Sequence, residues 1–142
     1  MVGSLLYYAR ALDGTMLPIS NATSSRQTKP TQQTKDKCKR LLDYAAIYPN
    51  TFIRYHATDM VLHVDSDAAY LVLPKARSRI ARYYQLSDYP TKLDTINGPL
   101  LIEYKTIRNV VTSAAEAEMG GIYHNAQTSF PIRYILEALH HP

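Results

Sequence analysis

The apolar residues at the start of the chain recur with the period of a helix. Residues 4–12, S-L-L-Y-Y-A-R-A-L, have the length and apolar content of a short helix, and the Asp13-Gly14 pair that follows is typical of a helix end. Thr15 is the predicted N-cap of a second helix that runs into the N-A-T-S-S stretch. Its first turn accommodates Pro18, because the amide hydrogen that proline lacks has no helical partner there.

A third helix is predicted over residues 32–47. Thr31 is a suitable N-cap for it. The apolar side chains of this segment stand three and four positions apart, which places them on one face of a helix: Cys38, Leu41, Leu42 and Ala45. Pro49-Asn50 ends the helix. We place a domain boundary here, with a helical segment over residues 1–49 and a second domain over residues 50–142.

After this boundary the pattern changes from helical to alternating, which indicates strands. The strand candidates are Phe52–His56, Met60–Val64, Arg82–Leu86 and Leu100–Thr106. The first candidate is also compatible with an extended lead into the second. Turn-forming residues fill the segment between the last two candidates, and Asn97-Gly98 within it is the strongest hairpin signal in the chain.

The last part of the chain returns to a helical pattern. Residues 113–126 are a predicted helix with Ser113 as its cap, and a final helix is predicted to begin near Ser129 with Pro131 in its first turn. Apolar side chains lie on one face of that final helix: Ile132, Ile135, Leu136 and Leu139. The sequence therefore predicts an α+β fold, with an N-terminal helical segment followed by a three-stranded antiparallel sheet and helices.

The composition narrows the class of protein. Of 142 residues, 46% are hydrophobic, which is an ordinary share for a globular protein and enough to bury a core. The single cysteine, Cys38, excludes an internal disulfide and a cysteine zinc cage, and this favours a reducing compartment. No apolar run approaches the roughly 20 residues that cross a bilayer, and we find no leader pattern. We expect a soluble, intracellular protein, cytoplasmic or nuclear, without a membrane partner.

Basic residues gather in two places along the chain. The formal net charge of +4 permits a polyanionic partner. The first cluster lies within residues 26–40 and the second around residues 75–82. From them we take as candidate nucleic-acid-binding residues Lys29, Lys35, Lys37, Lys39, Arg40, Arg77 and Arg79. A solvated helix face is the plainer interpretation of the first cluster.

A strand and a helix each carry an acid suited to a metal site. The strand in M-V-L-H-V-D-S-D-A-A-Y delivers Asp65 to its end, and Asp67 lies on the same side if the strand persists. Glu116 and Glu118 stand two positions apart on the later helix, about 200° around its axis, so only one of them can face the sheet. Small and apolar residues on the side of Glu118 favour it as the glutamate that faces the sheet.

These segments resemble a known family. V-D-S-D-A-A-Y, followed some forty residues later by V-T-S-A-A-E-A-E, resembles the ribonuclease H region of Copia-type retrotransposon polyproteins. The segments V-G-S-L-L-Y-Y-A-R and L-L-D-Y-A-A-I-Y-P resemble the end of the reverse transcriptase that precedes it. The resemblance covers nearly the whole chain. It implies that residues 1–49 belong to the thumb or connection of the reverse transcriptase and residues 50–142 to a partial ribonuclease H-like domain.

The resemblance also implies a chemistry. Family members hydrolyse the RNA of RNA/DNA hybrids with two Mg²⁺ ions held by carboxylates, and the matching positions here are Asp65 and Glu118 as catalytic metal ligands. Asp67 is a candidate for contacting these ligands without binding the metal ions itself. The third and fourth acids of the family follow a further strand, and this sequence stops at H-H-P before it. We therefore expect a fragment or degenerate copy with weak or absent Mg²⁺ binding and no hydrolysis.

Two other hypotheses stay open. The chain is a non-catalytic module that binds nucleic acid or another protein, with self-association through the strand edge that the missing half of the fold leaves uncovered. Alternatively, it is an unrelated small α+β domain, in which the strand acids are solvated and Glu118 is an ordinary exposed helix acid.

Overall fold

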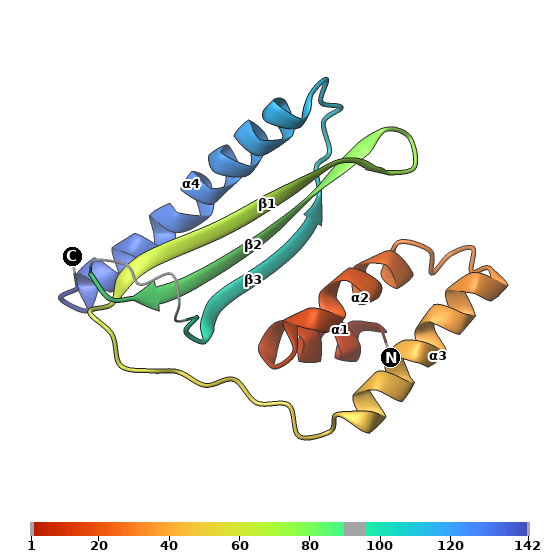
Figure 1. Ribbon diagram of the computed structural model, residues 1–142, viewed down its shortest axis with the longest axis horizontal. Coiled ribbons are helices and arrows are strands. Elements are labelled where there is room, and N and C mark those ends of the chain that lie inside the picture. Colours follow the sequence, from red (N-terminus) through yellow and green to blue (C-terminus); the bar gives the residue numbers. More distant parts are fainter. Residues whose placement is uncertain (1, 90–95, 142) are drawn as a thin grey trace. The chain divides into compact units, whose positions relative to one another are not determined.

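The computed structural model describes residues 2–89 and 96–141 (Figure 1). The chain divides into two compact units, Met1–Ile53 and Arg54–Pro142, which we call the N-terminal unit and the C-terminal unit. The division falls four residues after the position that the sequence suggested.

The N-terminal unit begins with two short helices joined by a tight turn. They are α1, Val2–Ala11, and α2, Leu17–Ser24, with the 3₁₀ turn η1, Gly14–Met16, between them. Pro18 lies in the first turn of α2, as the sequence predicts. The predicted Thr15 cap is wrong. The N-cap of α2 is Met16, which makes no side-chain capping bond. Asp13 caps η1 instead and accepts a hydrogen bond from the Thr15 amide at 3.1 Å.

Helix α3, Gln32–Ile47, has the predicted bounds. Thr31 caps it by accepting from the Thr34 amide, and the side chain of Thr34 in turn accepts from the Thr31 amide, which completes a capping box. Of the predicted apolar face, Leu41 is buried at 2% exposure, whereas Leu42 is 41% exposed. Leu41 joins Ala9 and Met16 in the buried set of this unit.

The C-terminal unit is built on a three-stranded antiparallel sheet in the order β1-β2-β3 (Figure 1). Its strands are β1, Val61–Leu73, β2, Arg77–Ser87, and β3, Pro99–Thr106. The predicted strand over Phe52–His56 is wrong, since this segment is irregular. Strand β1 continues nine residues past Val64, the predicted end, so that Asp65 lies in its middle and pairs with Tyr83. The α+β class is confirmed.

The residues predicted to turn the second hairpin have another role. Strands β2 and β3 do pair as neighbours, but Asn97-Gly98 directly precedes β3, and no described glycine has a positive φ, so a type I′ turn is not formed there. The side chain of Asn97 instead binds the backbone of His56 in both directions, accepting from its amide at 2.8 Å and donating to its carbonyl at 3.1 Å. A second donation reaches the Leu86 carbonyl at 2.9 Å. Asn97 thus fastens the segment before β1 to the sheet.

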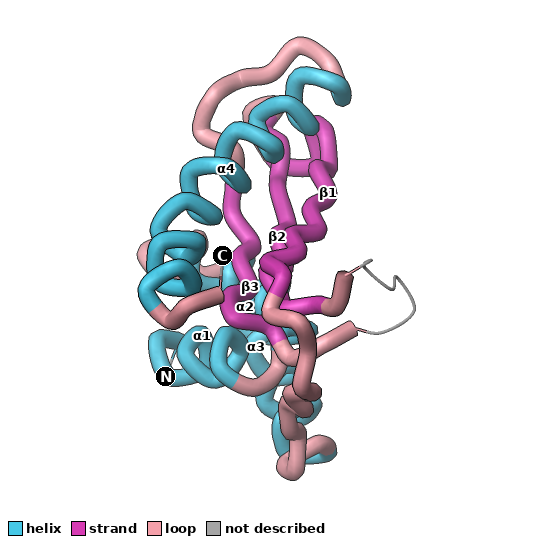
Figure 2. The backbone as a smooth tube through the Cα atoms, turned by 90° about the vertical axis from the view of Figure 1, so that its left-hand side faces the viewer, coloured by secondary structure: helices cyan, strands magenta, loops and turns pink. Residues whose placement is uncertain are grey.

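One long helix, α4, Ala114–Ala138, runs along the sheet beside β1 (Figures 1 and 2). Ser113 caps it as predicted. The predicted break before Ser129 is wrong: the helix continues through Pro131. Proline removes one backbone hydrogen bond there, whereas Leu136, one turn further on, is buried at 7% exposure and its burial favours keeping the helix intact.

Helix α4 packs closely on the sheet at Gly121. A Cβ at this position would stand 2.8 Å from Cδ1 of Ile80 on β2, so glycine allows the close approach. Ile80, Ile107, Val111 and Ala117 form the buried cluster between sheet and helix. Strand β1 is an edge strand of the sheet, and self-association through its edge stays a prediction.

Candidate functional site

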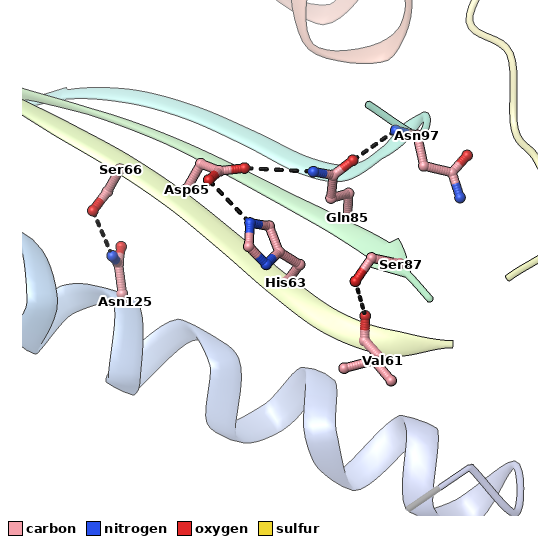
Figure 3. Close-up of polar contacts among 8 residues, drawn as sticks. All are labelled: Val61, His63, Asp65, Ser66, Gln85, Ser87, Asn97 and Asn125. Atoms are coloured by element: carbon pink, nitrogen blue, oxygen red, sulfur yellow. Dashed lines mark hydrogen bonds and ion pairs between the residues drawn. The ribbon is translucent and has the colours of Figure 1, made fainter. Parts of the chain in front are cut away.

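The two acids of strand β1 lie on the face of the sheet that helix α4 does not cover. Ser66 points toward α4, where its hydroxyl accepts a hydrogen bond from Asn125 at 2.7 Å (Figure 3). Successive side chains of a strand point to opposite faces. Asp65 and Asp67, on either side of Ser66, therefore lie on the opposite face from the helix, and both are exposed.

Asp65 belongs to a polar row that crosses this uncovered face (Figure 3). Its carboxylate contacts His63 Nε2 at 3.0 Å and accepts from the Gln85 amide at 3.4 Å. The side-chain oxygen of Gln85 in turn accepts from the Asn97 backbone amide at 2.6 Å. His63 and Gln85 face each other across the ladder between β1 and β2, so the row is fixed by strand register.

Tyr83 lies in the same row, opposite Asp65. Burial raises the pKa of its hydroxyl, and the neighbouring Tyr55 and Asp65 raise it further. The hydroxyl donates to the Asn97 carbonyl at 2.6 Å. Tyr83 is thus a neutral donor that supports Asn97, and nothing in the alternating sequence pattern around it distinguishes it from other strand tyrosines.

Glu118 is the helix glutamate that reaches the sheet. Its carboxylate accepts a hydrogen bond from the Ala68 amide on β1 at 3.3 Å. Glu116 binds the residues before its own helix instead, accepting from the Thr112 amide at 2.6 Å and the Thr112 hydroxyl at 2.8 Å. These bonds, the backbone one first, lower the pKa of Glu116 below its ordinary value.

The structure does not bring the predicted metal ligands together. Asp65 and Asp67 lie on one face of the sheet, and Glu118 approaches β1 from the helix side. Within residues 2–89 and 96–141, no group of three or more His, Cys, Asp or Glu side chains is arranged to hold a metal ion. Two Mg²⁺ ions about 4 Å apart need several carboxylates that converge, and Mg²⁺ binding by Asp65 and Glu118 stays a prediction.

The predicted nucleic-acid-binding residues fall into two groups. On the N-terminal unit, Lys29 precedes α3 and four further cations lie on that helix, all of them exposed: Lys35, Lys37, Lys39 and Arg40. On the C-terminal unit, Arg77 is exposed at the start of β2. Arg79 is half-buried, donates to the Tyr104 hydroxyl at 2.9 Å and lies over that ring. Arg79 thus has a packing partner, while the other cations are available to solvent.

Comparison with family models found no matching family, and comparisons with curated proteins and with solved structures found no significant match. Among the helices that the structure describes, none combines the length and the hydropathy that crossing a membrane requires.

Proposed function

We propose that the chain is a degenerate copy of a Copia-type ribonuclease H region, preceded by the end of the reverse transcriptase, and that it binds nucleic acid without hydrolysing it. The order of elements supports this origin: three antiparallel strands followed by a helix are what the resemblance implies. One observation carries the loss of hydrolysis. Asp65 and Glu118, the two acids that match the family's metal ligands, lie on different sides of strand β1.

The reaction needs a geometry that these residues lack. Hydrolysis with two metal ions requires carboxylates that hold both ions while one activates water and the other stabilises the leaving oxygen. The carboxylate of Glu118 already accepts the Ala68 amide, and that of Asp65 contacts His63 and Gln85. Each acid would have to give up these contacts before the two could share a metal ion.

Binding of nucleic acid requires less of the structure than its hydrolysis does. A polyanion is attracted by exposed cations, and each lysine that meets a phosphate releases a counterion and strengthens the complex. The exposed cations of α3 and the net charge of +4 support such binding. An RNA/DNA hybrid is the partner that the proposed origin favours.

The first experiment tests hydrolysis. A labelled RNA/DNA hybrid is incubated with the chain and with its Asp65→Asn variant, in Mg²⁺ and in Mn²⁺, and the products are separated by length. We expect an uncut hybrid in all four samples. Cleavage by the unaltered chain that disappears in the variant would contradict the proposal and restore the enzyme hypothesis.

The second experiment tests binding. The affinity for the same hybrid is measured over a range of salt concentrations for the chain, for a triple variant Lys35→Gln, Lys37→Gln, Lys39→Gln, and for Arg133→Gln as a control. The control removes a charge that pairs with Glu137 on α4. We expect the slope of log affinity against log salt to fall by about one for each lysine that meets a phosphate, and to stay unchanged in the control. Equal slopes in all three proteins would contradict the proposal.

A further inference from the structure

The C-terminal unit contains a cavity whose charged lining residues are all basic. It has a volume of about 330 Å³ and lies where β2, β3, the loop after β3 and helix α4 meet. Arg82 comes from β2, Lys105 from β3, Arg108 and Asn109 from the loop, and His124 from α4, with Ile80 as an apolar wall. We propose that this cavity is a binding site for a phosphate group.

The charge of the cavity favours an anion. Arg82, Lys105 and Arg108 are cationic at neutral pH, and no acid is among the lining residues. Outside the lining, Glu103 forms ion pairs with both Arg82 and Lys105. One carboxylate thus stands against three cations, and the surplus of positive charge attracts an anionic ligand.

Arg82 has a donor without an acceptor. Its side chain is only 3% exposed. One terminal nitrogen donates to the Tyr84 hydroxyl at 3.3 Å and to the Thr128 hydroxyl at 3.2 Å, and the other pairs with Glu103. The Nε–H group is buried and has no hydrogen-bond partner. A buried donor without a partner is unfavourable, and the guanidinium that carries it belongs to a residue that lines the cavity.

The remaining cations are placed to complete such a site. The side chain of Lys105 is 52% exposed, so it can turn toward a ligand. Arg108 is exposed and makes no ion pair or hydrogen bond with another described residue. One ring nitrogen of His124 lies 3.3 Å from the Gln127 side-chain oxygen, which leaves the other ring nitrogen for a ligand. Guanidinium groups match the geometry of phosphate oxygens.

The size of the cavity limits what it can hold. A volume of about 330 Å³ is at the lower end of small-molecule sites, which begin near 300 Å³. It accepts a phosphate group, free or carried on an ester. None of the α3 lysines of the proposed hybrid contact lines it, so this site is tested separately from hybrid binding, although nucleic acid is one source of the phosphate.

The test is a titration of the full chain followed by NMR, using the His124 ring signals and the backbone amide signals of residues 105–109. Sodium phosphate is added at constant ionic strength, with sodium chloride as the reference. We expect shifts that saturate with phosphate alone. In Arg108→Gln the affinity should fall about tenfold, because a charge-assisted contact to the ligand is lost. Arg133→Gln, which changes the charge equally but lies outside the cavity, should bind as the unaltered chain does.

A second titration identifies the source of the phosphate. Dimethyl phosphate represents the phosphodiester of a nucleic-acid backbone, and inorganic phosphate represents a terminal or free phosphate. Saturable binding of either one supports the site and tells which kind it takes. Shifts that never saturate, or equal affinities in the unaltered chain and Arg108→Gln, would overturn it. Hybrid binding that fails while phosphate still saturates the cavity would contradict the proposed function and leave this site standing.

Discussion

Glu116 and Glu118 stand two positions apart on α4, yet their carboxylates bind different groups. Glu118 accepts the Ala68 amide of the sheet, and Glu116 accepts the amide and hydroxyl of Thr112, which precedes the helix. The angle between them around the helix was readable from the sequence. The role of Glu116 was not, because it depends on the path of the chain before Ser113.

The pKa of Glu116 predicts a dependence of stability on pH. Its pKa is lowered in the folded chain by the bonds from Thr112, so its contribution is present above the unfolded value of about 4.3 and is lost as the pH falls through the folded value. We expect Glu116→Gln to be less stable than the unaltered chain near neutral pH, with the difference shrinking in acid. Urea unfolding at several pH values measures it, with Glu137→Gln as the charge-matched control. A difference that stays constant down to strongly acid pH would contradict the assignment.

The alternation along β1 was also readable from the sequence. It places Asp65 and Asp67 on the side opposite Leu62 and Val64, and a helix packs on the more apolar side of a strand. The resemblance implies that Asp65 and Glu118 bind the same metal ions. Helix α4, however, packs on the Ser66 side of β1, which is opposite the side of Asp65. The alternation of side chains along the strand thus decides which acids can approach each other. A sequence motif that matches a family does not decide it.

Among the elements, those defined by local signals were predicted best. Helix α3 follows from its Thr31 cap and the Pro49 that ends it, both of which act within a few residues. The length of β1 depends on pairing with β2, as in Ala68 with Ile80 twelve residues later, and this pairing lies outside the short window that a strand pattern covers. The continuity of α4 through Pro131 likewise depends on Leu136 packing in the unit, which no local signal announces.

The two adjacent glycines of α4 provide a matched test of its packing. A Cβ at Gly120 would meet no other group within 4 Å, whereas one at Gly121 would stand 2.8 Å from Ile80 Cδ1. We expect Gly120→Ala to raise the free energy of unfolding by about 0.5–1 kcal/mol, because alanine favours the helix. The free energy of unfolding of Gly121→Ala should be lower than that of Gly120→Ala by about 1 kcal/mol or more. The added Cβ would contact Ile80, which is only 2% exposed and must move. Urea unfolding compares them, and equal gains would show that α4 is not tightly seated.

At the scale of the whole molecule, the contacts of the C-terminal unit begin before its first strand. Tyr55 donates to the Pro99 carbonyl at 3.1 Å, and the backbone of His56 exchanges hydrogen bonds with Asn97. Asp59 accepts from the Tyr89 amide at 3.0 Å. The irregular segment between residue 54 and β1 is therefore part of the folded unit, through side-chain and backbone contacts that the strand pattern over Phe52–His56 did not predict.

We expect a fragment of residues 54–142 to fold by itself, because the buried cluster and these contacts are internal to it. A fragment of residues 61–142 keeps every strand and α4 but loses the bonds of Tyr55, His56 and Asp59. It should be less stable by about 2–4 kcal/mol, the contribution of four hydrogen bonds. Urea unfolding of both fragments, with amide NMR spectra to compare their folds, measures the difference. Equal stability of the two would show that the segment does not hold the sheet.

Asn97, which joins the segment before β1 to the sheet, is also a residue that we expect to change chemically with time. An asparagine before a glycine is prone to deamidation, in which the glycine amide nitrogen attacks the side-chain carbonyl carbon and ammonia leaves. Here the Gly98 amide donates to the Asn97 side-chain oxygen at 2.8 Å, and the Asn97 side chain is occupied at both ends by His56 and Leu86. These bonds slow the attack while the C-terminal unit is folded. Once it occurs, water opens the cyclic imide that the attack forms, and a carboxylate replaces the amide donor beside the carbonyls of His56 and Leu86. The C-terminal unit of each molecule that has reacted is then less stable.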